Sequence, residues 1–249
     1  MSGHSKWATI KHKKGAADKA RGKLFAKLIR QVEVAAREGG GDPDSNPTLR
    51  TMFQKARDNS VPLDTIERAI KRGTGELEGV TYESITYEGY APHGVAILVE
   101  VLTDNRNRTG SEIKTIFTRG GGSLAEPGAV AWQFDRRGVV LVPGEVGEDD
   151  LMLVALDAGA DDIVDDGGTW RVTCEPQALS DVRDALDAAG IAVESADTAM
   201  ISQTVIELDS GEAAKSVLNV MDALDDHDDV QAVHANFDIP ESILETIEA

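Results

Sequence analysis

Residues 139 to 201 alternate between short strand patterns and amphipathic helices in an order that few folds can accommodate. Alternation of apolar and polar residues predicts strands, and apolar residues three or four positions apart predict helices. In chain order the expected elements cover strand 139–142, helix 149–158, strand 161–164, strand 169–174, helix 176–189 and strand 192–195. This β-α-β-β-α-β order is that of a complete ferredoxin-like unit. We therefore expect residues 137–201 to fold as a domain of their own.

The segments on either side of this unit are each incomplete. Before it, the expected elements are strands over 81–87, 95–102 and 130–134 and a helix over 108–119. After it, they are a strand over 204–208, a helix over 213–224 and a strand over 230–235. A β-α-β segment buries its apolar face only against a partner. The pattern predicts one discontinuous α+β domain formed by residues 76–136 and 202–249, with the ferredoxin-like domain inserted in it.

The first 75 residues show helical patterns only. A first helix is expected over 16–37. A second is expected with Asn46 as its cap and Pro47 at its first position, and a third follows Pro62 and stops at Gly73. The expected fold is therefore multidomain α+β, with an N-terminal helical domain over 1–75 and two α+β domains, the third inserted in the second.

Charge is distributed very unevenly along the chain, whose net charge is −19. Residues 1–37 contain ten Lys and Arg against two acidic residues, a surplus of +8, while residues 76–249 carry −27. A local cationic surplus of this size is what contact with a phosphate backbone requires. Nucleic acid, either DNA or ribosomal RNA, is the first partner that the sequence indicates.

The cations fall into an expected arm and one flank of the first expected helix. The flank has helical spacing and consists of Lys19, Lys23, Lys27 and Arg30. The arm contains Lys6, Lys11, Lys13 and Lys14, with Trp7 placed to stack on a base. Two alternatives remain open: the charge run is simply a solvated helix face, and Trp7 packs back on the helical domain.

A secondary phosphate site is predicted where a strand runs into a helix, at residues 104–109. Main-chain N–H groups at a helix start, together with Arg106 and Arg108, suit a phosphate. The alternative is that Asn105 or Asn107 caps the helix while the arginines pair with carboxylates of the inserted domain.

Other classes of function have weak support. We find no recognisable catalytic constellation, so the sequence predicts a protein that is not an enzyme, with no cofactor, metal or small-molecule substrate. The acidic run 225–229 is interpreted as a solvated loop rather than a cation site. Cys174 alternates like a buried strand residue and is expected to be inert. The apolar runs are too short to cross a membrane and no signal peptide pattern is present, which favours a cytoplasmic location without membrane contact.

Several motifs spread along the chain resemble the YebC family. They are GHSKW at 3–7, KHKK at 11–14, KLFAKLIR at 23–30, IERAIKRG at 66–73, YEGY at 87–90 and TDNRNRT at 103–109. The resemblance implies three domains with one inserted in another. It also implies a probable transcriptional regulator, since bacterial members are tied to DNA binding, whereas mitochondrial relatives activate translation.

The expected function is thus a non-enzymatic, nucleic-acid-binding regulator of gene expression, with DNA-binding control of transcription first. A ribosome- or RNA-associated translational activator is the alternative. A third possibility is an acidic protein-interaction scaffold that uses the acidic domains alone.

Overall fold

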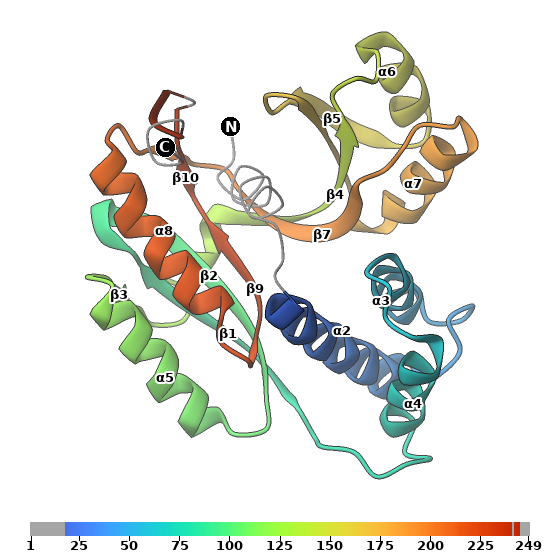
Figure 1. Ribbon diagram of the computed structural model, residues 1–249, viewed down its shortest axis with the longest axis horizontal. Helices are drawn as coiled ribbons and strands as arrows, with labels where there is room; N and C mark the ends of the chain where they lie inside the picture. Colours follow the sequence, from blue (N-terminus) through green and yellow to red (C-terminus); the bar gives the residue numbers. More distant parts are fainter. Residues whose placement is uncertain (1–17, 241, 245–249) are drawn as a thin grey trace. The chain divides into compact units, whose positions relative to one another are not determined.

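A computed structural model describes residues 18–240 and 242–244 (Figure 1). The described chain divides into two compact units, each of which is discontinuous in sequence. The first, here called the N-terminal unit, comprises residues 18–129 and 212–233. The second, here called the inserted unit, comprises residues 130–211 and the described residues from 234 onward. Together they confirm a multidomain α+β protein with an N-terminal helical region.

Three helices form the helical region of the N-terminal unit: α2 (Asp18–Gly39), α3 (Pro47–Asp58) and α4 (Leu63–Gly73). The predicted cap of α3 is confirmed, because Asn46 Oδ1 accepts a hydrogen bond of 3.1 Å from Leu49 N and Pro47 is the first helical residue. Asn46 Nδ2 also donates to the carbonyl oxygens of Ala35 and Gly40, which ties the cap to the end of α2. One side chain thus fixes both helix ends and the turn between them.

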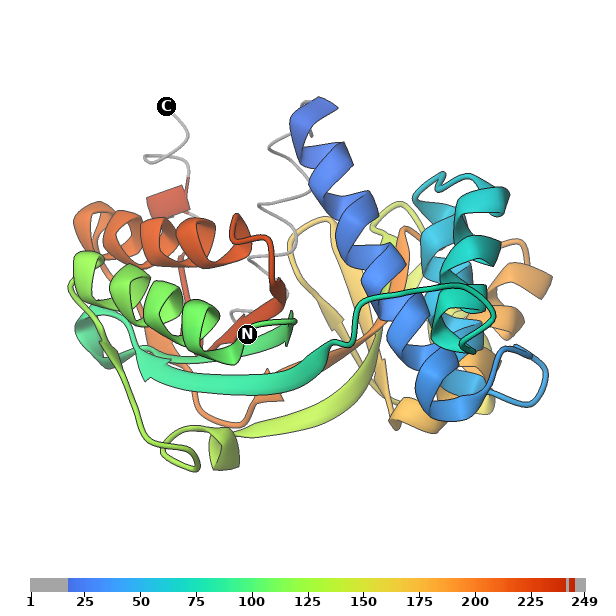
Figure 2. The ribbon, with the colours of Figure 1, turned by 90° about the horizontal axis from the view of Figure 1, so that it is seen from below.

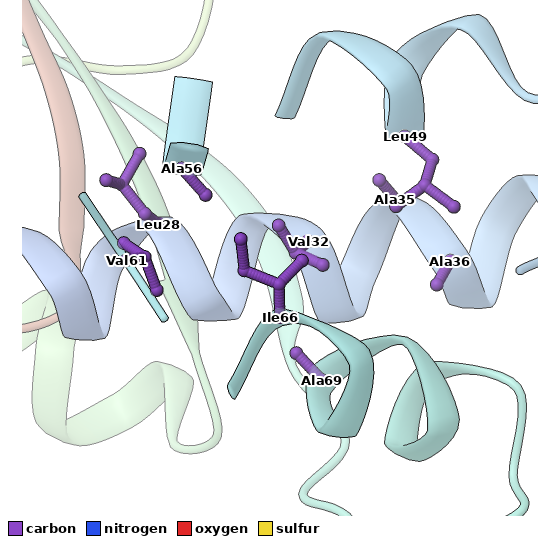
Figure 3. Packing of buried hydrophobic residues seen from close by; sticks show 9 residues of the cluster. All are labelled: Leu28, Val32, Ala35, Ala36, Leu49, Ala56, Val61, Ile66 and Ala69. Carbon is purple, nitrogen blue, oxygen red and sulfur yellow. The ribbon is translucent and has the colours of Figure 1, made fainter. Parts of the chain in front are cut away.

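The core of the helical region lies between these three helices (Figure 3). Leu28, Val32 and Ala35 project from α2 at the predicted spacing and are almost fully buried. They meet Leu49 of α3 and Ile66 of α4. At Gly73 a Cβ atom would lie only 2.4 Å from the carbonyl oxygen of Glu33, so glycine allows the end of α4 to approach α2 closely.

A four-stranded sheet completes the N-terminal unit. Its strands are β1 (Glu83–Tyr90), β2 (Ala96–Thr103), β3 (Ser123–Leu124) and β9 (Val230–Ala235), in the order β3-β1-β2-β9. Strands β1 and β2 pair antiparallel along their whole length. Helices α5 (Arg106–Arg119) and α8 (Gly211–Asp225) cover the same face of the sheet (Figure 2). The last strand of the sheet therefore comes from a segment far along the chain, as the unmatched β-α-β pattern predicts.

The inserted unit has the predicted β-α-β-β-α-β order. The elements are β4 (Phe134–Pro143), α6 (Glu148–Asp157), β5 (Ala160–Asp165), β6 (Thr169–Cys174), α7 (Leu179–Ala188) and β7 (Ser195–Ser202). The strand order is β5-β6-β4-β7 with antiparallel neighbours. Its core contains Val140, Val172, Leu151 and Leu186, contributed by two strands and both helices. A short 3-10 turn, η3 (Pro176–Ala178), precedes α7, so the helix expected from Pro176 begins three residues later.

Two strand predictions are wrong in position. The strand expected over 130–134 is instead a 3-10 turn, η2 (Ala131–Gln133), in which Trp132 is 69% exposed, and β4 begins only at Phe134. The domain boundary expected between residues 136 and 137 falls inside β4. The domain limits given by the sequence stay predictions. The strand expected over 192–195 begins at Ser195 and runs to Ser202, because pairing with β4 continues through polar residues such as Asp197.

The expected strand 204–208 is shorter and has a different partner. Strand β8 (Ile206–Glu207) pairs in parallel with β10 (Phe237–Asp238) in a two-stranded sheet of its own. It does not join the four-stranded sheet that contains β9. Residues 242–244 are helical.

Cys174 lies at the end of β6 and is completely buried. Burial raises the pKa of its thiol to about 11, with a further rise from Asp161 and Glu175 that Arg137 partly offsets. Because the thiolate is the reactive form, we expect no labelling by a thiol reagent near neutral pH. The same protein unfolded in urea should react fully, and rapid labelling of the native chain would contradict the assignment of this cysteine to the core.

Candidate nucleic-acid interface

The predicted flank of α2 is present as a row of cations, here called the cationic face: Lys23, Lys27 and Arg30. These residues follow each other by four and three positions, which places them on one side of the helix next to the buried stripe. The side chain of Lys27 is only 10% exposed, and that of Arg30 is 22% exposed. The Arg30 guanidinium also lies over the ring of Tyr82, 5.4 Å from its centroid. These cations are therefore held in place rather than extended into solvent.

The acidic segment Asp225–Asp229, which runs from the last residue of α8 to the start of β9, covers these cations. Lys23 Nζ lies 2.5 Å from Asp226 Oδ1, and Lys27 Nζ lies 2.5 Å from the carbonyl oxygen of Asp225. Arg30 Nη1 lies 2.8 Å from the carbonyl oxygen of Asp228 and 3.0 Å from Asp229 Oδ1. Three of the four predicted flank cations thus contact residues about 200 positions later in the same unit.

Asp229 is the centre of this arrangement and is 5% exposed. Its Oδ2 atom accepts hydrogen bonds from Thr109 Oγ1 at 2.7 Å, from Arg108 Nη2 at 3.0 Å and from Thr103 Oγ1 at 3.1 Å. Burial opposes ionisation, but the hydrogen bonds from Thr109, Arg108 and Thr103 and the charge of Arg30 outweigh it and hold the pKa of Asp229 below its usual value. A buried, ionised carboxylate therefore joins α2, α5 and the strand end at Thr103.

The interpretation of residues 225–229 as a solvated loop is wrong for Asp229. Its neighbours differ, since the side chains of Asp226 and Asp228 are exposed. His227 Nε2 lies 2.9 Å from Glu112 Oε2, and its Nδ1 accepts a hydrogen bond from Asp229 N. The acidic run can be seen in the sequence. No sequence pattern indicates that Thr103 and Thr109 contact it.

At the secondary candidate site, Asn105 caps α5, because its Oδ1 accepts a hydrogen bond of 3.1 Å from Arg108 N. Arg108 bonds to Asp104 as well as to Asp229, and these contacts, led by the one to Asp229, raise its pKa. The alternative with a capping asparagine and a paired arginine therefore describes Arg108, although its partners are in the N-terminal unit and not in the inserted domain. Arg106 is exposed beside Tyr87, whose hydroxyl donates to the Arg106 carbonyl oxygen at 3.4 Å.

The remaining predicted site residues lie outside the described part. Residues 1–17 are not described, and they include Lys6, Trp7, Lys11, Lys13 and Lys14. The side chain of Lys19 is likewise outside the described set. Their role stays a prediction.

One further ion-pair cluster in the helical region was not anticipated. Glu33 of α2 is 3% exposed and pairs with Arg72 Nε at 2.8 Å and with Arg37 Nη2 at 3.4 Å. Arg37, counted in the cationic surplus, is thus committed to a structural contact.

Neither a metal-binding cluster nor a membrane-spanning helix occurs among the described residues. No group of three or more His, Cys, Asp or Glu residues in the described chain is arranged to hold a metal ion. Among the described helices, none has both the length and the apolar character needed to cross a membrane.

Comparison with known proteins extends over nearly the whole chain. Residues 5–76 match the TACO1/YebC protein N-terminal domain, and residues 82–237 match the TACO1/YebC second and third domain. A protein of Thermobifida fusca is 57% identical over 249 residues, which cover 99% of this chain and all of that protein. A protein of Halothermothrix orenii is 54% identical over 250 residues, which cover 99% of both chains. Both bear the name probable transcriptional regulatory protein.

A solved structure agrees with the fold described above. The crystal structure of a conserved hypothetical protein from Aquifex aeolicus superposes with a TM-score of 0.82 at 44% sequence identity. The match covers 90% of this chain and 93% of that one. With both family matches and full-length relatives above half identity, the chain belongs to the TACO1/YebC family.

Proposed function

We propose that this protein is a nucleic-acid-binding regulator of gene expression without catalytic activity, and that it controls transcription by binding DNA. The relatives' name supports regulation of transcription. The observation that carries the binding proposal is the charge distribution, +8 over residues 1–37 against −27 over residues 76–249. Phosphates attract the first segment and are repelled by most of the rest. The contacts would come from the arm, with Lys6, Trp7, Lys11, Lys13 and Lys14, and from α2, with Lys19 and the cationic face.

The polar cluster around Asp229 supports a role other than catalysis. Its carboxylate is buried, hydrogen-bonded by three side chains and held ionised by a lowered pKa. A general base works best with a pKa near the operating pH and with access to substrate. Asp229 has neither property, so we assign it to the architecture of the N-terminal unit.

A second candidate function is binding to ribosomes in support of translation, and the charge of −27 over residues 76–249 favours it. A free duplex offers phosphates alone, whereas a ribosome presents basic proteins beside its RNA. The phosphates of a duplex repel the acidic domains, whereas the basic proteins of a ribosome attract them.

The two candidates are separated by titrating the full chain against a DNA duplex of mixed sequence and against purified ribosomes. Between about 50 and about 200 mM salt, contact with roughly five phosphates gives a log–log slope of about −3 to −5 on the duplex. The DNA proposal expects this slope together with tight duplex binding. Ribosome binding that persists at salt concentrations where the duplex is released would support the role in translation and contradict the DNA proposal. Loss of both complexes at low salt would contradict a nucleic-acid role altogether.

Replacing Lys13 and Lys14 by alanine should make that salt slope shallower by ~1 to 2 units, since two phosphate contacts are removed. The matched control replaces Lys114 and Arg119, two exposed cations of α5, and changes net charge equally. Binding is measured by fluorescence anisotropy and unfolding by circular dichroism. An unchanged salt slope in the arm variant, or an equal change in the control, would mean that the lysines of the arm are simply solvated and make no phosphate contacts.

A further inference from the structure

The cationic face of α2 is already occupied by oxygen atoms of the same chain. Lys23, Lys27 and Arg30 lie within about 10 Å along the helix axis. They meet carboxylate oxygens of Asp226, Asp225 and Asp229. Main-chain carbonyl oxygens of Asp225, Asp226 and Asp228 complete the contacts. A phosphate backbone would offer the same kind of acceptor to the same cations.

The acidic segment is held unevenly. Asp229 is anchored from α2, α5 and the end of β2. The side chain of Asp226, at the other end, is 76% exposed and has the short contact to Lys23. An exposed ion pair contributes little to stability and is screened by salt, whereas a buried, hydrogen-bonded carboxylate is costly to release. The side chain of Asp226 can therefore release Lys23 while Asp229 stays in place, whereas the more buried pair of Lys27 and Asp225 costs more to open.

From these contacts we propose that Asp225 and Asp226 act as an internal competitor for nucleic acid on α2. This inference rests on the proposed function and adds a regulation of that same site. In the structure Lys23 and Lys27 bind the acidic segment. Nucleic acid then gains the contacts to α2 only by displacing Asp225 and Asp226. The competition weakens non-specific binding, because each phosphate contact on α2 replaces an ion pair that already exists.

The competition has a defined salt signature. Each neutralised phosphate releases counterions from the nucleic acid, but a displaced carboxylate takes up cations from solution, so displacement of carboxylates adds little to the salt slope. Asp225→Asn and Asp226→Asn remove the carboxylate charges that oppose phosphate at both lysines, while the main-chain carbonyl contacts remain. We expect affinity for the duplex to rise tenfold or more near 50 mM salt and the slope to steepen by about 1 to 2 units.

Two controls separate this effect from a general change in charge. Asp149→Asn with Asp150→Asn on α6 changes net charge by the same amount in the inserted unit. Asp228→Asn is compared with Asp226→Asn alone. Both are exposed carboxylates of the acidic segment, but among the described contacts Asp228 meets Arg30 through its carbonyl oxygen, whereas Asp226 meets Lys23 through its carboxylate. Both controls should leave the affinity within about twofold of the native protein, whereas Asp226→Asn should raise it several-fold.

A double-mutant cycle with Lys23→Ala and Lys27→Ala gives the decisive result. In the native chain these replacements should lower affinity by less than about threefold, because the lysines are occupied. In the Asp225→Asn, Asp226→Asn chain they should remove the whole gain. Equal losses of affinity in both backgrounds, or equal gains of affinity in the charge controls, would contradict competition by Asp225 and Asp226. The proposal of nucleic-acid binding would still stand. Absence of binding to the duplex and to ribosomal RNA in every variant would overturn the proposed function and the competitor together.

Discussion

Replacing Asp229 by alanine is expected to lower the free energy of unfolding by about 3 kcal/mol, because it leaves buried hydrogen-bond donors and two arginine contacts without their carboxylate. The side chain accepts from Thr103, Thr109 and Arg108 through one oxygen and contacts Arg30 through the other. Urea unfolding followed by circular dichroism measures the change. The matched control is Asp228→Ala, one residue earlier and exposed, for which we expect less than about 0.5 kcal/mol.

The contribution of Asp229 should also depend on pH in a defined direction. Its pKa is lower in the folded chain than in the unfolded chain, so the unfolded state binds more protons as pH falls below the ordinary aspartate value of about 4. The stabilisation is therefore complete above that pH and is lost as pH falls toward the folded pKa. The difference between the native chain and Asp229→Asn should shrink below about pH 4 and stay constant from about pH 6 to pH 8. A difference that grows on acidification would contradict the ion-pair assignment.

The second large effect is expected at Phe117, which is fully buried where α5 packs on the sheet of the N-terminal unit. Its ring leaves no room for a side chain at position 89, where a Cβ atom would lie 2.7 Å from the ring, so Gly89 and Phe117 pack as a pair. Phe117→Ala removes this contact and leaves a cavity, and we expect a loss of about 3 to 5 kcal/mol.

Thermal and urea unfolding of the Phe117 variant should be compared with Trp132→Ala. Trp132 is a larger aromatic residue that is 69% exposed, so its replacement should change stability by less than about 1 kcal/mol. Similar losses at the two positions would mean that burial of Phe117 does not carry the packing of α5.

Local patterns were sufficient for most elements of the fold. Asn46 and Pro47 set the start of α3 through chemistry that involves only nearby residues. Helix α4 ends at Gly73 as predicted, but the left-handed glycine that follows it is Gly75, at φ 84°. The prediction of a strand over 130–134 is wrong because an apolar run can also lie in a turn when the adjacent sheet does not extend to it. Strand β7 extended beyond its predicted end because pairing with β4, not apolar alternation, decides where it stops.

The candidate site was predictable in its cations and unpredictable in its anions. Helical spacing placed Lys23, Lys27 and Arg30 together, as observed. Nothing in the sequence indicated that Asp226 pairs with Lys23, because the two residues are 203 positions apart and only the tertiary fold brings them together. A charge count by segment therefore overstated the positive charge that α2 presents.

The split N-terminal unit also fixes an order of events during synthesis. Helix α2 is made early, but Asp225–Asp229 and strand β9 follow only after residues 130–211 have been translated. Until then the sheet lacks the strand beside β2, and Lys23, Lys27 and Arg30 lack their contacts to the acidic segment. Closure of contacts this distant in sequence is slow compared with helix formation. The nascent chain thus passes through a stage in which a basic helical region is complete while its acidic counterpart has yet to be made.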